Sequence, residues 1–242
     1  MLLVIHKNYS ELSKKAAGIL IKEISKNPSL AIGFATGSTP LGLYKKLVLA
    51  YRNKKISFSD MISFNLDEYY RINREDKNSY YSYMCKNLFN KIDIKKSNIN
   101  FLNGEAENPE KECQEYEKKI ENKPIDIQIL GVGVNGHIGF NEPNSSFNSR
   151  TRLVNLSQET ISSNSRFFKN KKQAPKQALT MGISTIMKAK KILLLASGKN
   201  KAEAIFHLVK GKPDEKWPVT CLKNHKNLTV IIDREAAGLI NN

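Results

Sequence analysis

Short apolar runs alternate with longer amphipathic stretches along the chain. Each apolar run is bounded by glycine, proline or polar residues, which is typical of buried strands. The longer stretches carry apolar residues at helical spacing, as between Tyr9 and Ile24. This alternation predicts one α/β domain over residues 1–242. The predicted strands are Leu2–Ile5, Leu30–Ala35, Met61–Leu66, Ile99–Leu102, Ile125–Leu130, Lys191–Ala196 and Leu228–Ile232.

The amphipathic stretches predict helices between most of these strands. Pro109–Ile120 is strongly charged, so we expect it to present a solvated face. After Pro143 the chain is polar and irregular, and the segment from about 144 to 175 is either a lid over a site or a plain surface loop. The other predicted helices are Tyr9–Ile24, Ser79–Phe89, Thr160–Phe168, Ala202–Val209 and a short terminal helix capped by Asp233.

The most distinctive chemistry follows the strand that ends at Leu130. Residues 131–143 (GVGVNGHIGFNEP) combine glycines with Asn135, His137 and Glu142. Glycines remove side chains where the backbone must approach another group closely. A strand end that carries glycines and proton-handling groups is where α/β enzymes place their chemistry. We therefore expect a functional site here rather than a glycine-rich turn without a ligand.

The same residues also match a dinucleotide-binding pattern, with glycines at 131, 133 and 136. That pattern needs a helix that begins within the glycines and an acidic residue roughly 20 positions further on, at a strand end. Gly139 and Pro143 oppose an immediate helix, and Glu159 lies in a polar, helix-like segment. We therefore do not expect a nicotinamide cofactor.

A second candidate site follows the strand that ends at Ala35. Gly37, Ser38 and Thr39 form a turn before a predicted helix, which Ser38 or Thr39 can cap and in which Pro40 suits the first turn. Free backbone amides and the helix dipole would attract phosphate. The Gly-Lys-Ser/Thr ending of a Walker loop is absent. Ordinary helix capping is the alternative explanation.

Two further strand ends carry charged residues. Asp67 and Glu68 follow the strand that ends at Leu66, and we expect only Asp67 to face the site as a general base. Residues 197–201 (SGKNK) follow another strand and open a helix, where a lysine opposes the helix dipole. Such a lysine is better explained by an anion than by the helix itself, and simple solvent exposure is the alternative explanation.

The chain of 242 residues carries a formal net charge of +16. Such an excess suggests nucleic-acid binding, but the lysines occur as scattered pairs and no basic run has the length of a nucleic-acid tail. A positive field also favours a phosphorylated substrate.

Composition also bears on the compartment. Cys85, Cys113 and Cys221 are far apart and show no metal-ligand spacing, so we expect reduced thiols. The apolar N-terminal run Met1–Ile5 is too short for a signal peptide or a membrane span. We therefore expect a cytoplasmic protein that binds neither membranes nor nucleic acid.

Taken together, these stretches resemble the glucosamine-6-phosphate deaminase family over nearly the whole chain. The most specific matches are residues 64–69 (FNLDEY), 136–143 (GHIGFNEP), 164–168 (NSRFF), 35–40 (ATGSTP) and 178–182 (ALTMG). The resemblance implies a three-layer α/β/α sandwich, a modified Rossmann-like fold with a mostly parallel central sheet. It implies conversion of D-glucosamine 6-phosphate and water to D-fructose 6-phosphate and ammonia, without a metal or other cofactor.

The resemblance also implies roles for individual residues. Asp67 would be the base for enolisation and His137 the proton acceptor in ring opening, and Asn135 and Glu142 would orient and tune the imidazole. The phosphate group would be bound by Gly37, Ser38, Thr39, Arg166 and Lys201.

Some positions depart from the family pattern. Asn135 stands where some members carry Asp, so we expect it to orient His137 rather than relay a proton. Hexameric, allosterically activated members have a basic pair where this chain has Arg152 and Val154. We therefore expect a monomer or small oligomer without activation by N-acetylglucosamine 6-phosphate. The alternatives are a 6-phosphogluconolactonase or sugar-phosphate isomerase on the same fold, or a non-catalytic sugar-phosphate sensor.

Overall fold

The computed structural model describes residues 1–158, 160–161 and 174–240 of the chain. Seven parallel strands form the main sheet, in the order β1-β10-β9-β6-β2-β3-β5. All seven predicted strands are present, with small differences at their ends. They are β1 (Leu2–His6), β2 (Ala31–Phe34), β3 (Ile62–Asn65), β5 (Ile99–Asn100), β6 (Ile127–Leu130), β9 (Lys191–Ala196) and β10 (Leu228–Asp233).

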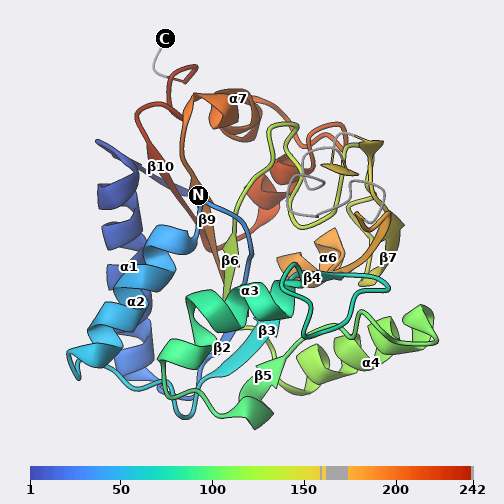
Figure 1. Ribbon diagram of the computed structural model, residues 1–242. Coiled ribbons are helices and arrows are strands. Elements are labelled where there is room, and N and C mark those ends of the chain that lie inside the picture. The colour runs from blue at the N-terminus through green and yellow to red at the C-terminus, as the bar shows by residue number, and fades with distance from the viewer. Residues whose placement is uncertain (159, 162–173, 241–242) are drawn as a thin grey trace.

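Helices cover both faces of this sheet, which gives the three layers of the expected sandwich (Figure 1). Strand β9 shows why both faces need cover: Leu193 and Leu195 pack into the core cluster that contains the buried residues of α1 and α2, whereas Ile192 and Leu194 pack into the cluster of α4, α6 and α7. The helices are α1 (Tyr9–Lys26), α2 (Leu41–Arg52), α3 (Tyr80–Asn87), α4 (Pro109–Asn122), α6 (Ile183–Met187) and α7 (Ala202–Lys210). Short 3₁₀ helices are η1 (Phe89–Lys91), η2 (Lys96–Asn98), η4 (Lys199–Lys201) and η5 (Pro218–Asn224).

A second, antiparallel sheet of three strands was not predicted from the sequence. Its order is β4 (Asp67–Tyr69), β8 (Gln177–Thr180) and β7 (Arg152–Asn155). Each strand has only three or four residues, too few for an alternating pattern to stand out. They form because each pairs with a segment far away in the chain, as Asp67 does with Thr180.

Helix α4 presents the predicted solvated face, with Lys111, Glu115 and Lys119 exposed. Its opposite face buries Cys113, Tyr116 and Ile120 in the core. Its Glu117 is also buried, and its carboxylate accepts hydrogen bonds from Thr151 and Arg150.

One local prediction was wrong: the short terminal helix is absent, since residues 234–240 form turns. Asp233 still caps the first of these turns, because its carboxylate accepts from the amide of Ala236 at 2.9 Å. The same carboxylate also accepts hydrogen bonds from Ser197 and Gly198, and so ties the end of β10 to the loop after β9.

The sheet order decides where the loops meet. Strands β9, β6, β2 and β3 are consecutive neighbours and run in parallel, so the loops after their carboxyl ends lie along one edge. Such an edge is the usual ligand site of an open α/β sheet. Within the described ranges, every helix is too short or too polar to span a bilayer.

Candidate active site

A cavity of about 570 Å³ opens at the carboxyl ends of these four strands. It is lined by four segments that are far apart in the chain, together with side chains from α3 and from the segment after β7. Asp67, His137, Lys201 and the turn of residues 37–39 therefore share one cavity, as expected from the strand ends. The full lining is Ala35, Thr36, Gly37, Ser38, Thr39, Pro40, Leu66, Asp67, Tyr80, Gly131, Val132, Gly133, Val134, His137, Gly139, Phe140, Thr160, Ser197, Asn200 and Lys201.

Asp67 lies at the start of β4 with only 6% of its surface exposed. Its Oδ1 has no hydrogen-bond partner among the described residues. Burial raises the pKa of Asp67 to about 8, and the neighbouring charge of Glu68 adds to this effect. A carboxyl group that lines a cavity and titrates near neutral pH suits general-base chemistry.

Glu68 points away from this cavity, as expected for the next residue of a strand. Its carboxylate accepts hydrogen bonds from the backbone amides of Tyr69, Tyr80 and Tyr81, each at 2.9 Å. Burial raises the pKa of Glu68 to about 7, although these three bonds oppose the shift. Glu68 therefore anchors the start of α3 and does not itself line the cavity.

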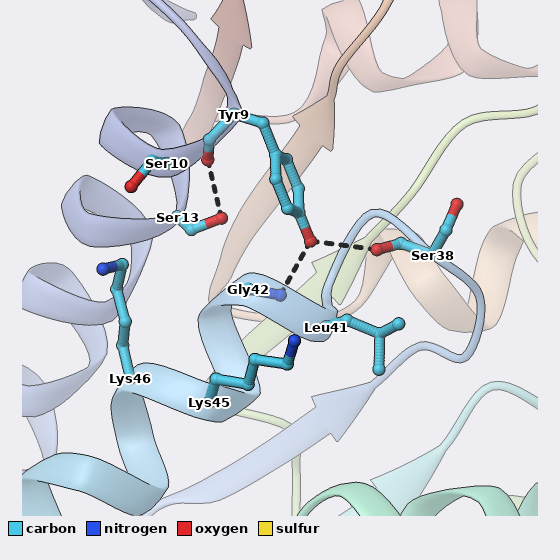
Figure 2. A pocket seen from close by; sticks show the side chains of 8 residues that line it. All are labelled: Tyr9, Ser10, Ser13, Ser38, Leu41, Gly42, Lys45 and Lys46. Atoms are coloured by element: carbon cyan, nitrogen blue, oxygen red, sulfur yellow. Dashed lines mark hydrogen bonds between the residues drawn. The ribbon is translucent and has the colours of Figure 1, made fainter.

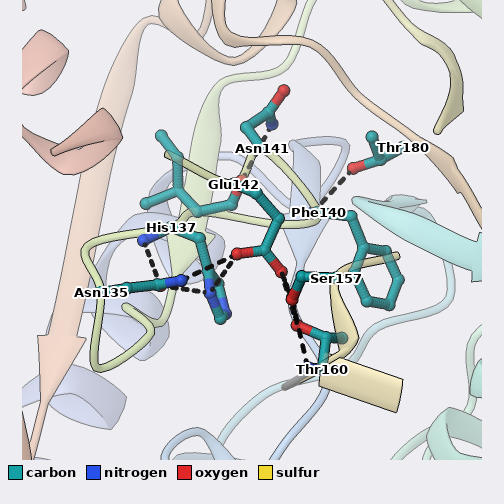
Figure 3. A network of polar contacts seen from close by, with 9 residues as sticks. Asn135, His137, Phe140, Asn141, Glu142, Ser157, Thr160 and Thr180 are labelled. Carbon is teal, nitrogen blue, oxygen red and sulfur yellow. Dashed lines mark hydrogen bonds and ion pairs between the residues drawn. The ribbon is translucent and has the colours of Figure 1, made fainter. Parts of the chain in front are cut away.

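His137 belongs to a hydrogen-bonded set with Asn135 and Glu142 (Figure 3). Asn135 donates from Nδ2 to Oε2 of Glu142 at 2.8 Å, and its Oδ1 lies 2.7 Å from Nδ1 of His137. A carboxylate only accepts, so it orients the amide with the oxygen towards the imidazole. Nδ1 of His137 must then carry the proton, which leaves Nε2 as the basic nitrogen of the neutral ring.

Glu142 is held in its charged form. Burial opposes ionisation, but contacts with His137, Thr160 and Asn135 outweigh it and lower the pKa of Glu142 to about 2. Oε2 of Glu142 lies 3.5 Å from Nδ1 of His137, and Thr160 donates to the other carboxylate oxygen at 2.5 Å. A fixed negative charge beside the ring stabilises the imidazolium that forms when His137 takes up a proton.

Two glycines of residues 131–143 have identifiable structural reasons, one steric and one conformational. A Cβ atom on Gly133 would lie 2.2 Å from Cε1 of His137, so only glycine leaves room for the ring. Gly136 has a φ of +80°, a conformation that favours glycine. No helix begins in residues 131–151, which agrees with the rejection of a dinucleotide site; Glu159 lies outside the described residues.

The turn of residues 37–39 lies beside Asp67 and His137 in the same cavity. Gly37 has a φ of +98°, which explains the glycine. The predicted hydroxyl cap was wrong, because α2 begins at Leu41, Pro40 takes the capping position and neither hydroxyl caps the helix. In the described part of the chain, no protein group accepts from the amides of Gly37, Ser38 and Thr39.

Lys201 ends η4 and faces the same cavity from the β9 side. None of the described carboxylates forms an ion pair with it, and burial lowers its pKa. The side chain is thus available for an anion. Arg166, the other expected phosphate ligand, lies outside the described residues.

Several lining residues were not singled out as site residues from the sequence. Thr160 reaches Glu142 from the segment after β7, and no motif marked it. Tyr80 and Phe140 stack with ring centroids 6.0 Å apart and form an apolar wall of the cavity. From the sequence, the position of Tyr80 on a predicted helix indicates only a place in the core or in a site wall. Among the described residues, no group of three or more His, Cys, Asp and Glu side chains could hold a metal ion.

Residues 7–231 match the family described as "Glucosamine-6-phosphate isomerases/6-phosphogluconolactonase". A glucosamine-6-phosphate deaminase of Clostridium novyi (strain NT) is 53% identical over 239 residues, which cover 98% of this chain and 99% of the relative. A glucosamine-6-phosphate deaminase of Thermoanaerobacter sp. (strain X514) is 52% identical over 241 residues, with 99% and 95% covered.

Two solved structures extend the comparison. A monomeric glucosamine-6-phosphate deaminase superposes with a TM-score of 0.96 at 45% identity, over 99% of this chain and 100% of that one. A 6-phosphogluconolactonase from Trypanosoma cruzi superposes with a TM-score of 0.78 at 22% identity, over 100% and 97%. The second likeness shows a shared fold alone.

Proposed function

Because the chain belongs to the family of glucosamine-6-phosphate isomerases and 6-phosphogluconolactonases, we propose that it converts D-glucosamine 6-phosphate and water to D-fructose 6-phosphate and ammonia. The observation that carries this proposal is the meeting of Asp67 and the His137 set in one cavity beside the turn of residues 37–39. Full-length relatives at about 50% identity are named as this deaminase, which favours it over the lactonase.

Ring opening comes first, because the substrate is a closed sugar. Neutral His137 takes the proton of the C1 hydroxyl at Nε2, the C1–O5 hemiacetal bond breaks as C1 becomes an aldehyde, and the imidazolium returns the proton to the ring oxygen O5. Asn135 holds the ring in the required tautomer through the 2.7 Å contact to Nδ1. Charged Glu142 stabilises the transient imidazolium.

Enolisation follows on the open-chain aldehyde. Ionised Asp67 removes the proton from C2, and a proton is then delivered to C1, so that the carbon bearing nitrogen becomes an imine. Water adds to this imine and ammonia leaves, which gives the ketose. Since Oδ1 of Asp67 has no partner among the described residues, its lone pairs are free for this transfer.

The phosphate group of the substrate would lie against the turn of residues 37–39, where the backbone amides have no acceptor among the described residues. Lys201 would add a positive charge. We also expect Arg166 to contribute, by its match to the family motif. The free amides and the unpaired lysine support this placement because both favour an anion.

Ammonia release tests the proposal directly. The protein is incubated with glucosamine 6-phosphate, and the ammonia and fructose 6-phosphate that form are each measured. In a separate incubation, 6-phosphogluconolactone is offered as the rival substrate and its hydrolysis is measured. Equal amounts of both products are expected, and the lactone should remain at its spontaneous rate of hydrolysis. Absence of ammonia above background would reject the deaminase activity. Lactone hydrolysis above the spontaneous rate would then favour a 6-phosphogluconolactonase.

We further propose that the chain acts as a monomer in the cytoplasm, in one domain. The monomeric deaminase at 45% identity supports the first point, and free cysteines at 85, 113 and 221 suit a reducing compartment. A lid over about residues 144–175 stays a prediction; Thr160, in this segment, already contacts the site. Analytical ultracentrifugation tests the monomer.

A further inference from the structure

Three tyrosine hydroxyls from three helices bind carbonyl groups of the turn that follows β2. Tyr44 of α2 donates to the carbonyl of Ala35 and Tyr83 of α3 to that of Gly37, each at 2.5 Å. Tyr9 of α1 lies 3.0 Å from the carbonyl of Ser38 and 2.9 Å from that of Thr39. The same hydroxyl accepts from the amide of Gly42 at 2.7 Å, which ties α1 to the first turn of α2 (Figure 2).

The three tyrosines act from behind the turn. None of them lines the 570 Å³ cavity that holds Asp67 and His137. Tyr9 lines instead a separate cavity of about 340 Å³ between α1 and α2. Any effect of the three hydroxyls on a ligand beside Asp67 must therefore pass through the backbone of residues 35–39.

Peptide geometry transmits this effect. In a trans peptide the carbonyl of one residue and the amide of the next point in opposite directions. When Tyr83 holds the carbonyl of Gly37, it fixes the amide of Ser38 in the opposite direction; Tyr9 does the same for Thr39 through the carbonyl of Ser38. The amides so directed have no acceptor in the described part of the protein.

We propose that Tyr9, Tyr44 and Tyr83 are positioning residues that hold the turn of residues 35–39 with its amides directed at the phosphate group of the substrate. This inference rests on the proposed function for the identity of the ligand. The hydroxyls also keep the carbonyl dipoles away from a dianion, which they would repel. Donors fixed before the ligand arrives need no reorganisation when it binds.

The chemistry of the phenols suits this role. Burial raises the pKa of Tyr44 well above its ordinary value, and burial raises that of Tyr83 too, with a further contribution from nearby Tyr9. Both groups are therefore protonated and remain hydrogen-bond donors at neutral pH.

Removal of single hydroxyls tests the inference. Tyr9→Phe and Tyr83→Phe should each raise KM for glucosamine 6-phosphate about 3- to 10-fold, the equivalent of one hydrogen bond, and should leave kcat within about twofold. The dissociation constant for inorganic phosphate, measured by calorimetry, should rise by a similar factor. Tyr51→Phe is the matched control, since Tyr51 is on α2 and its hydroxyl bonds to no described residue.

The outcomes separate the two proposals. A lower melting temperature with unchanged KM and unchanged phosphate affinity would mean a structural role only and would overturn the inference. If the wild type releases no ammonia yet binds phosphate more tightly than Tyr9→Phe and Tyr83→Phe, the function fails and the positioning role stands. If the wild type binds no phosphate, the inference fails. Tyr44 is fully buried, so Tyr44→Phe is used only if it folds.

Discussion

Replacement of Asp67 by asparagine should stabilise the protein while it abolishes turnover. The carboxyl group is buried, its Oδ1 has no partner in the described part of the chain, and burial raises its pKa from 3.8 to about 8. Because the folded-state pKa lies above the unfolded one, the folded protein binds this proton more tightly than the unfolded chain. The contribution of Asp67 to stability is therefore greatest below about pH 4 and is lost as the pH rises to about 8.

The size of the effect follows from the shift. At pH 7.5 the ionisation cost reaches at most about 5 kcal/mol, at about 1.4 kcal/mol for each pH unit above 3.8. Water that enters the cavity lowers this figure, so we expect Asp67→Asn to be about 2–4 kcal/mol more stable than the wild type at pH 7.5. At pH 4 the two proteins should agree to within about 1 kcal/mol.

Urea unfolding at a series of pH values between 4 and 8.5 measures this difference. Titrating groups that do not interact with Asp67 affect both proteins equally and cancel in the comparison, whereas Glu68, whose charge raises the pKa of Asp67, contributes to the measured difference. Asp60→Asn is the matched control, because its carboxylate is 57% exposed beside Lys95 and its removal should give a small effect with little dependence on pH. Ammonia release by Asp67→Asn should be undetectable, whereas fructose 6-phosphate should still bind.

Two results would contradict this reasoning. A stability difference between the two proteins that stays constant from pH 4 to 8.5 would mean that burial does not raise the pKa of Asp67. A variant that is less stable than the wild type at pH 7.5 would mean that the ionised group has favourable partners in solution. Normal turnover would remove Asp67 from the mechanism altogether.

Further outcomes are expected at the other site residues. Since Asp67 must be ionised to act as a base, kcat/KM should rise with pH towards a plateau above about 8; a flat profile between pH 6 and 9 would contradict this. Gly133→Ala would place a Cβ 2.2 Å from the His137 ring, so kcat/KM should fall about 100-fold or more. The circular dichroism spectrum should be unchanged, and a fully active variant would mean that the ring tolerates displacement. Glu142→Gln should lower kcat about 10-fold or more, by loss of the charge beside the imidazolium. Because the folded pKa of Glu142 is lowered to about 2, the stability lost in this variant should be evident above pH 4.5 and vanish as the pH falls towards 2; a loss that persists at pH 2 would refute the assignment. Arg166→Ala should raise KM about 10-fold with little change in kcat, as the loss of uniform binding would, and an unchanged KM would remove Arg166 from the phosphate site.

The main sheet could be predicted because its determinants are local. Strand β9 occupies Lys191–Ala196 as the apolar run indicates, since a strand buried on both faces must be apolar along its whole length. Strand ends that carry Asp67 or His137 could be recognised as sites, because parallel strands bring their carboxyl ends to one edge. The resemblance to the deaminase family rests on these strand ends together with residues 35–40, 164–168 and 178–182.

Features that depend on distant partners could not be predicted in this way. Strand β7 exists through its pairing with β8, and the buried carboxylate of Glu117 through Thr151 and Arg150. Thr160 belongs to the site only because the fold returns it to Glu142. None of these contacts leaves a periodic mark in the sequence.

The residue types along the chain thus determined the seven strands of the main sheet and the strand ends at which candidate site residues lie. Tertiary structure alone decided how those groups act. The tautomer of His137 depends on an amide oriented by Glu142, and the need for glycine at position 133 depends on where the imidazole lies. The high pKa of Asp67 depends on its burial. Hydrogen-bond direction, steric room and desolvation are properties of three-dimensional surroundings, and a one-dimensional pattern of residue types does not contain them.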